Sequence, residues 1–324
     1  MKKIKWGLVG LGQISDLFAK DLLLVEDAEI YAVGSRSKDK AQDFARKYDV
    51  QKAYGSYEEI FKDPEIDIIY IGTPHNSHAE LSVEAMKCGK HVLCEKPLAL
   101  NQRQAESIIN ASRKYKKFFM EAFWSRFNPS IKEVKRKVGD GLIGDVKYIN
   151  ADFAFYIEVF EGSRMTNMEL GGGSLLDIGV YPLFLSYLIL GMPEKVLATS
   201  NFFDSGADKQ TSMILQYKQA QAVLHSSFVS QSNMIATVSG EKGRINLNFV
   251  WHEAQSYSVH LGDQTEEFQL PIKGKGYTYE IQECHKCILN NKIESDFWSH
   301  QDSLSLISIV DEVRKQIGLR YPSE

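Results

Sequence analysis

The stretch Ile4-Lys-Trp-Gly-Leu-Val-Gly-Leu-Gly-Gln-Ile-Ser15 decides the fold. Its apolar run, residues 4–9, predicts a buried strand, and a helical pattern continues from the glycine turn to about Leu24. Gly10 permits a tight turn, Gly12 lets the backbone approach a pyrophosphate, and Ser15 is small enough for close helix-sheet packing. Because a helix N-terminus offers free amides and a positive dipole end, the turn predicts a dinucleotide site.

The candidate cofactor contacts in this turn are Gly10, Gly12, Gln13 and Ile14. The alternative interpretation is a strand, turn and helix with no ligand, since a G-x-G-x-x-S pattern is weak by itself.

Short apolar runs alternate with helical patterns through the first 120 residues. The predicted strands after the first are 30–33, 66–71, 91–94 and 118–123, and the predicted helices are 38–48, 79–88 and 102–115. Strands that are apolar throughout and alternate with helices indicate a parallel sheet covered on both faces, which is a doubly wound α/β fold.

The pattern changes after Phe123. Predicted helices cover 129–138, the stretch from Gly173 to about Leu190, 279–289 and 302–317, and predicted strands cover 146–156, 195–203, 211–217, 222–228, 234–238 and 257–261. This pattern is typical of a large, mainly antiparallel open sheet with helices on one face. We therefore predict a dinucleotide-binding Rossmann domain, 1–122, and a substrate-binding and dimerisation α+β domain, 123–324, whose C-terminal helix packs back on the first.

Composition limits the function classes. The chain has 324 residues, 44% hydrophobic and 25% charged, with a formal net charge of −4. Such a chain is expected to be a globular protein of two domains, and not a general nucleic-acid binder. The apolar run 183–192 is shorter than a membrane-spanning helix, and four cysteines do not make a disulfide scaffold. We expect a cytoplasmic protein with no membrane or nucleic-acid partner.

The end of the second strand, Val33-Gly-Ser-Arg-Ser37, bears on the cofactor. An NAD site usually places Asp or Glu here to bind the ribose 2′-hydroxyl, and none occurs before Asp39. Arg36 can bind a 2′-phosphate, with the hydroxyls of Ser35 and Ser37 beside it. This segment predicts NADP rather than NAD, and a solvated arginine at a helix start is the alternative.

Two loops follow the fourth and fifth strands, at the edge where doubly wound sheets bind ligands. They read Thr73-Pro-His-Asn-Ser-His78 and Cys94-Glu-Lys-Pro-Leu-Ala99. The candidate cofactor contacts in them are Thr73, Pro74, His75, His78, Glu95 and Lys96. The histidines could instead cap the next helix, and no third ligand lies nearby in sequence, so we predict no metal site. The pair Cys284 and Cys287 is interpreted as structural.

These motifs, together with Gly171-Gly-Gly-Ser-Leu-Leu-Asp-Ile-Gly-Val-Tyr181, resemble the Gfo/Idh/MocA oxidoreductases over essentially the whole chain. The resemblance implies a Rossmann domain, a C-terminal domain whose open sheet commonly forms a homodimer, and a lysine, here Lys96, that acts at the substrate oxygen. Many members have His where this chain has Tyr181. That departure argues against an inositol-dehydrogenase-like enzyme.

Tyr181 fits the branch with dimeric dihydrodiol dehydrogenases, glucose-fructose oxidoreductase and some NADP-dependent xylose dehydrogenases. The segment Glu121–Phe127 and Arg164 also resemble this branch, and the candidate substrate-binding residues are Trp124, Arg126 and Arg164. Aromatic side chains at Trp124, Phe153, Phe155 and Tyr156 either form a wall of the substrate pocket or belong to the core or the dimer face.

Hydride transfer from a carbinol also requires a proton to leave its oxygen. Our hypothesis makes Tyr181 the general acid/base, with Lys96 lowering the tyrosine pKa and stabilising the developing alkoxide. Lowering a tyrosine pKa from about 10 to near 7 takes roughly 4 kcal/mol, which an ammonium at about 4 Å can supply. Asp177, at i, i+4 from Tyr181 on one helical face, would hold a substrate hydroxyl or orient the lysine. Each residue has an alternative without a catalytic role: Lys96 as a surface lysine, Tyr181 as a core aromatic residue, and Asp177 as a carboxylate on the helix face.

The sequence thus predicts an NADP-dependent dehydrogenase or reductase of a small molecule: a vicinal diol of the trans-dihydrodiol type, a sugar, or a related carbonyl compound. A xylose-type sugar dehydrogenase is the nearest alternative. From other classes, a nicotinamide-binding sensor without turnover and the NAD-dependent glycosidase chemistry found in this family remain open.

Overall fold

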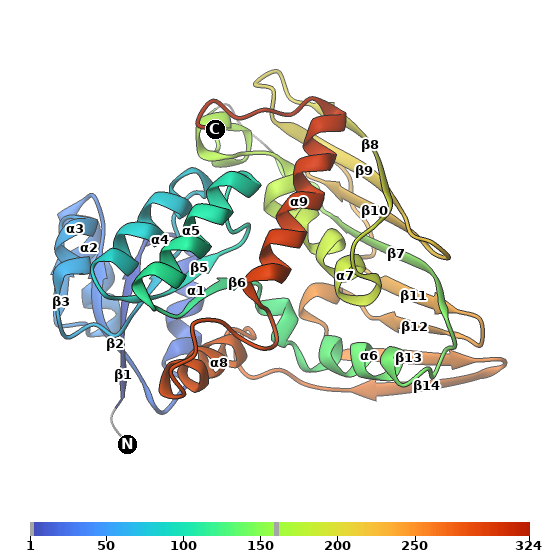
Figure 1. The fold of residues 1–324 in the computed structure, drawn as a ribbon, viewed down its shortest axis with the longest axis horizontal. Helices are drawn as coiled ribbons and strands as arrows, with labels where there is room; N and C mark the ends of the chain where they lie inside the picture. The colour runs from blue at the N-terminus through green and yellow to red at the C-terminus, as the bar shows by residue number, and fades with distance from the viewer. Residues whose placement is uncertain (1–2, 159–161) are drawn as a thin grey trace. The chain divides into compact units, whose positions relative to one another are not determined.

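The computed structural model describes residues 3–158 and 162–324. They form two compact units, each with its own sheet (Figure 1). The first unit comprises the residues up to Phe127 together with Lys273–Leu304, and the second comprises Asn128–Ile272 and Ser305–Glu324.

The first unit contains a six-stranded parallel sheet of order β3-β2-β1-β4-β5-β6. Its strands are β1 (Ile4–Val9), β2 (Ala28–Gly34), β3 (Lys52–Tyr54), β4 (Ile68–Ile71), β5 (His91–Glu95) and β6 (Phe119–Ala122). Its helices are α1 (Gln13–Leu22), α2 (Lys38–Tyr48), α3 (Tyr57–Lys62), α4 (His78–Lys87), α5 (Gln102–Tyr115) and α8 (Thr278–Leu289). The predicted doubly wound α/β fold is confirmed.

The sequence did not predict β3 and α3. β3 has only three residues, all partly exposed at the sheet edge, so it shows no apolar run. α3 has six residues, too few for a helical period to be recognised.

The returning segment, residues 273–304, is attached to the first unit by buried polar contacts. The Asp21 carboxylate on α1, 2% exposed, accepts the amides of Lys275, Gly276 and Tyr277 at 2.8–3.0 Å. Trp6 on β1 donates its indole N–H to His285 on α8 at 2.9 Å. Tyr277 therefore lies in the first unit, although about 150 residues separate it from Phe127.

The second unit contains an eight-stranded sheet of order β14-β13-β12-β11-β7-β10-β9-β8. Its strands are β7 (Val146–Ala154), β8 (Lys195–Phe202), β9 (Asp208–Gln216), β10 (Gln221–Ser227), β11 (Ala236–Gly240), β12 (Arg244–Leu247), β13 (Ser256–Leu261) and β14 (Gln264–Gln269). β7 and β10 pair in parallel and the other neighbours are antiparallel, so the predicted mainly antiparallel sheet is confirmed. The sequence missed β12, which is short, and β14, which is a mostly exposed edge strand without alternation.

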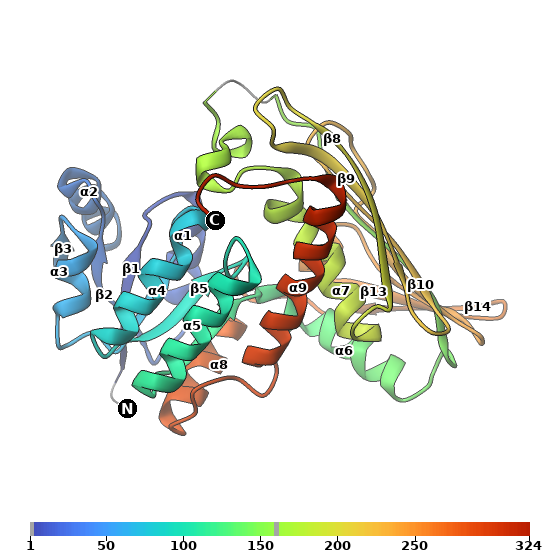
Figure 2. The ribbon, with the colours of Figure 1, turned by 45° about the horizontal axis from the view of Figure 1, so that its top comes forward.

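Helices α6 (Pro129–Gly139) and α7 (Val180–Leu190) lie on the same side of this sheet (Figure 2). The last helix of the chain is α9 (His300–Ile317). The stretch Met168–Leu190 is long and apolar enough to cross a membrane, but 72% of its most apolar window is buried inside the protein. This extent of burial is typical of a helix in the core of a protein.

The helix predicted directly after Gly173 does not begin as a regular α-helix. Leu175–Gly179 form a π-helical turn, and α7 starts only at Val180. Pro182 has no amide hydrogen to donate to the carbonyl of Ile178, so a regular α-helical ladder cannot run through this point.

Candidate functional site

The turn between β1 and α1 has the geometry that a pyrophosphate requires. Gly10 has a φ of +80°, and a Cβ there would lie 2.5 Å from the backbone of Gly72 and Thr73. Gly12, the N-cap of α1, is exposed, and a Cβ there would meet no atom closer than 3.8 Å. The amides of Gln13 and Ile14 in the first helical turn have no intrahelical partner by position. The chain therefore leaves an open, amide-lined approach for an anion.

Ser15 packs the helix onto the sheet, as the sequence predicts. It is fully buried and donates to the carbonyl of Gly10 at 2.9 Å. Its Oγ lies so close to Gly72 that a Cβ on that glycine would stand 2.5 Å away. Both small residues are needed for this approach.

The end of β2 presents a basic group beside hydroxyls. Ser35 is buried and its Oγ accepts the amide of Ser37, which caps α2. Arg36 is exposed and lies beside Tyr57 on α3, where it opposes the rise that burial causes in the pKa of that phenol. Tyr57 could not be predicted as a neighbour of Arg36, because this contact depends on α3, which the sequence did not predict.

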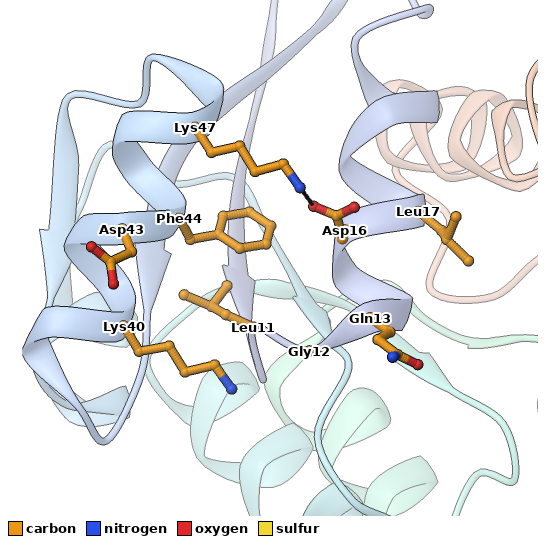
Figure 3. Close-up of a pocket in the computed structure, with 9 residues that line it drawn as sticks. All are labelled: Leu11, Gly12, Gln13, Asp16, Leu17, Lys40, Asp43, Phe44 and Lys47. Atoms are coloured by element: carbon orange, nitrogen blue, oxygen red, sulfur yellow. Dashed lines mark hydrogen bonds and ion pairs between the residues drawn. The ribbon is translucent and has the colours of Figure 1, made fainter.

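A cavity of about 590 Å³ opens between α1 and α2 (Figure 3). Leu11, Gly12 and Gln13 line one wall, and Lys40 extends from α2 toward the Leu11–Gly12 turn. An ion pair between Lys47 and Asp16 closes its far side. The cavity thus joins the glycine turn to a second basic side chain from the segment after β2.

The loop after β4 is held to the loop after β5 by a histidine. His78 is fully buried, and its two ring nitrogens lie 2.9 Å from the carbonyls of Thr73 and Pro97. Ser77 donates to the Thr73 hydroxyl at 2.8 Å. His75 is also buried, with its ring centroid 5.7 Å from that of His78. His78 therefore joins the two predicted cofactor loops in addition to starting α4.

The turn that carries Lys96 follows β5 directly. The preceding Glu95 is buried and accepts the Tyr70 hydroxyl at 2.7 Å. The amide of Leu98 donates to the Glu121 carboxylate on β6 at 2.8 Å. Lys96 itself is half-buried. The structure thus brings the predicted cofactor residues to the carboxyl ends of β1, β2, β4 and β5.

Two predicted substrate residues of the first unit pack against the returning segment. Trp124 is 4% exposed, with its ring 5.0 Å from that of Tyr277. Arg126 is buried, donates to the carbonyl of Phe297 at 2.8 Å and lies over the Phe297 ring. Burial lowers the pKa of its guanidinium. These contacts give Arg126 a structural role, and its contact with substrate stays a prediction.

In the second unit, Tyr181 belongs to a cluster of rings. It is 5% exposed, with its ring 5.4 Å from Phe153 and 5.1 Å from His252. Phe153 and His252 stack at 4.1 Å. His252 was not predicted, because it lies in a short 3-10 helix, Trp251–Glu253, that is placed only by the packing of the sheet.

Asp177 pairs with Arg164. The guanidinium lies 3.0 Å from the Asp177 carboxylate, and the two side chains are 42% and 17% exposed. Both residues were predicted for the site, and the structure shows that they interact. Lys96 and Tyr181 belong to different units, so the effect of one on the other stays a prediction.

The turn that carries Asp177 is fixed by Asp208, another residue that the sequence analysis missed. This buried carboxylate accepts from the hydroxyls of Ser174 and Thr211 and from the amide of Leu175 at 2.7–2.9 Å. A Cβ on Gly173 would collide with it. The missing side chain at Gly173 therefore leaves room for the buried Asp208 carboxylate beside the first residues of the helix.

Among residues 3–158 and 162–324, no group of three His, Cys, Asp or Glu side chains is arranged to hold a metal ion. The four cysteines are free, and burial raises the pKa of Cys284 and Cys287.

Comparison with known proteins identifies the family. Residues 4–123 match the family model described as "Oxidoreductase family, NAD-binding Rossmann fold", and residues 131–246 match the "GFO/IDH/MocA C-terminal domain". The chain belongs to the Gfo/Idh/MocA oxidoreductase family. The resemblance inferred from its motifs is confirmed, and the chain is an oxidoreductase with a nicotinamide dinucleotide-binding domain.

Several relatives span the whole chain. A trans-1,2-dihydrobenzene-1,2-diol dehydrogenase from Xenopus tropicalis is 38% identical, over 98% of this chain and 99% of the relative. A scyllo-inositol 2-dehydrogenase (NADP(+)) from Bacillus subtilis (strain 168) is 33% identical, over 99% of both. The expectation that Tyr181 argues against inositol dehydrogenases finds no support in this relative.

A solved structure has the same fold. A 3-ketoreductase from Actinomadura kijaniata, crystallised with NADP and TDP-benzene, superposes with a TM-score of 0.89 at 26% identity, over 98% of both chains.

Proposed function

We propose that this protein is an NADP-dependent oxidoreductase that transfers a hydride between the nicotinamide and a vicinal diol of the trans-dihydrodiol type. The observation that carries this proposal is the setting of Tyr181. A phenol that can exchange a proton lies among aromatic rings, Phe153 and His252, that suit a flat unsaturated ring. The full-length relative that acts on such a diol supports the same substrate class.

The residues after β2 favour the 2′-phosphate of NADP. Residues 33–38 carry Arg36 and no acidic side chain, and Lys40 lines the cavity next to the glycine turn. A charge-assisted hydrogen bond contributes about 1.5 to 3 kcal/mol, which corresponds to a preference of roughly 10- to 150-fold. The scyllo-inositol dehydrogenase and the 3-ketoreductase, named with NADP, support this choice.

Residues of the chain bind the reactants and move the proton. When bound, the nicotinamide ring accepts or supplies the hydride. Tyr181 takes the proton from the substrate hydroxyl as the hydride leaves its carbon, and returns it in the reverse direction. Lys96 stabilises the negative charge on the phenolic and substrate oxygens, and Asp177, oriented by Arg164, accepts a hydrogen bond from the neighbouring hydroxyl.

A sugar or cyclic polyol is the second candidate substrate class. The Asp177–Arg164 pair supplies several donors and acceptors, which suit a substrate with many hydroxyls. Scyllo-inositol, the substrate in the name of one relative, is itself a ring of adjacent hydroxyls. This class includes the xylose-type alternative.

Tyr181→Phe separates the proton-transfer role from a packing role. The change keeps the ring and removes the hydroxyl, so we expect turnover to fall by roughly 10²- to 10⁴-fold with the Kd for NADPH unchanged. Reduction of NADP is measured with trans-dihydrodiols, free pyranoses and inositols. Tyr148→Phe, at an exposed tyrosine on β7 of the same unit, is the control. Turnover in Tyr181→Phe equal to that of the control would contradict the role.

Arg36→Glu tests the cofactor preference. A carboxylate here repels the 2′-phosphate and can accept from a ribose 2′-hydroxyl. We expect the KM for NADP to rise by at least about tenfold and the KM for NAD to fall. Arg46→Glu on the exposed face of α2 is the control for a charge change of the same size. Equal KM values for NADP in the two variants would refute the assignment.

The proposal includes a homodimer formed through the sheet of the second unit. On the sheet face opposite the buried Met213 and Leu215, the exposed apolar side chains of Leu197, Ile214 and Val223 stand in register across β8, β9 and β10. Such a continuous apolar row on an open face marks an association surface. The free cysteines, including the unpaired C-x-x-C, suit a reducing compartment, so we place the enzyme in the cytoplasm.

Ile214→Lys tests this interface. Burying a lysine ammonium in the middle of this apolar row costs free energy, so the variant should not dimerise. Sedimentation should show a dimer for the unmodified chain and a monomer for the variant. Leu289→Lys, at an exposed apolar residue of the first unit, should remain dimeric. A monomeric unmodified chain would rule the dimer out.

A further inference from the structure

The turn Lys96-Pro97-Leu98 is held by buried polar groups on both sides. The His78 ring lies against the carbonyl of Pro97, and the Glu121 carboxylate accepts the amide of Leu98. His78 joins two loops of the fold through contacts with their backbone carbonyls. Glu121 is different, because its carboxylate binds the turn two residues after Lys96, the lysine to which the proposed function assigns the substrate oxygen.

Glu121 lies on β6, paired in register with Cys94 on β5, and is 3% exposed. Its Oε1 accepts from the Leu98 amide at 2.8 Å. Its Oε2 accepts from the Ser303 hydroxyl at 2.7 Å and from the Trp298 indole N–H at 3.1 Å. Two of its three donors therefore come from the returning segment near the end of the chain.

All three of these partners donate to Glu121. A carboxylate accepts from all three, and two of them, the Leu98 amide and the Trp298 indole, can only donate. Burial raises the pKa of Glu121, and the Ser303, Trp298 and Leu98 donors together with the charge of Lys96 oppose that rise. Cys94, whose thiol is itself buried, is the residue paired with Glu121 across the two strands.

We propose that Glu121 is a positioning residue for Lys96: its carboxylate fixes the backbone of the turn through Leu98 and holds the neighbouring lysine as an ammonium, while Trp298 and Ser303 hold the carboxylate. The inference rests on the proposed function for the importance of Lys96 in turnover. It also assigns a task to the returning segment, which supplies the donors that keep this charge in place.

Attraction between the two charges makes a direct measurement possible. A nearby opposite charge favours the protonated form of a lysine and so raises its pKa. Removing the carboxylate should therefore let Lys96 lose its proton at lower pH. A purely structural role for Glu121 would change stability without changing this midpoint.

The test is competitive labelling of Lys96 by acetic anhydride across the alkaline pH range, followed by mass spectrometry of its peptide. Lys96 is half-buried, and the labelling needs no substrate or cofactor. In Glu121→Gln, the amide oxygen can still accept from Leu98 while the charge is lost. We expect the labelling midpoint to fall by at least about one pH unit. Ser303→Ala, which removes one donor, should lower it by less.

Two controls match these changes. Asp21→Asn removes another buried carboxylate that accepts three hydrogen bonds in the first unit, and Ser112→Ala removes another buried hydroxyl. Both should leave the Lys96 midpoint unchanged. If folded Glu121→Gln has the unmodified midpoint, or if Asp21→Asn shows the same shift, the inference is wrong. If Glu121→Gln does not fold, Ser303→Ala against Ser112→Ala decides in the same way.

The turnover number of Glu121→Gln provides a second test. Glu121→Gln should lower kcat about tenfold or more with the Kd for NADPH unchanged. A chain that reduces no cofactor with diols, sugars or inositols would contradict the proposed function. The labelling midpoint would still decide the relation between Glu121 and Lys96.

Discussion

The close approach of the first turn to the end of β4 is the constraint on which the first unit depends. Gly10 adopts a positive φ, and the backbone of Gly72 and Thr73 occupies the space that a side chain would need. The Ser15 hydroxyl also lies against Gly72, where a Cβ would stand 2.5 Å from its oxygen. Because the carboxyl ends of parallel strands meet at one edge, this contact aligns the glycine turn with the loops that follow β4 and β5.

Beneath that edge, buried polar groups hold the loops in place. Tyr70 binds Glu95, His78 bridges Thr73 and Pro97, and Glu121 binds Leu98. Each hydrogen bond to a charged group is worth about 1.5–3 kcal/mol, and leaving such a group buried without its partner costs more. The second unit uses the same device, since the buried Asp208 holds the turn that leads to Asp177 and Tyr181. In both units, the proposed reactive groups stand on backbone that polar contacts have already fixed.

The local sequence was sufficient for long elements with clear caps. The helix 102–115 was predicted at the bounds of α5, where Asn101 caps its first turn and the apolar residues form one face. It was not sufficient for β3, α3, β12 and β14, which are short or exposed and owe their conformation to neighbouring strands. The π-helical turn at Leu175–Gly179 was also missed, and its first amide is bound by Asp208, some thirty residues further along the chain.

The site residues likewise divide into those that local sequence predicts and those that depend on tertiary contacts. The residues of the glycine turn and of the two loops could be named because parallel-strand topology places them. Tyr57 and His252 were missed because their neighbours are distant in sequence. Glu121 stood in a quoted motif, but its role depends on Trp298 and Ser303, which no local pattern connects to it. Tertiary contacts, rather than composition or periodicity, decide such roles.

The central claim is that a hydride passes directly between a diol carbon and the nicotinamide. The most direct measurement uses a trans-dihydrodiol with deuterium at its carbinol carbons, incubated with NADP and the enzyme. The account predicts one deuterium at C4 of the nicotinamide in the NADPH that forms. Formation of NADPH without deuterium, or recovery of the label in water, would contradict it.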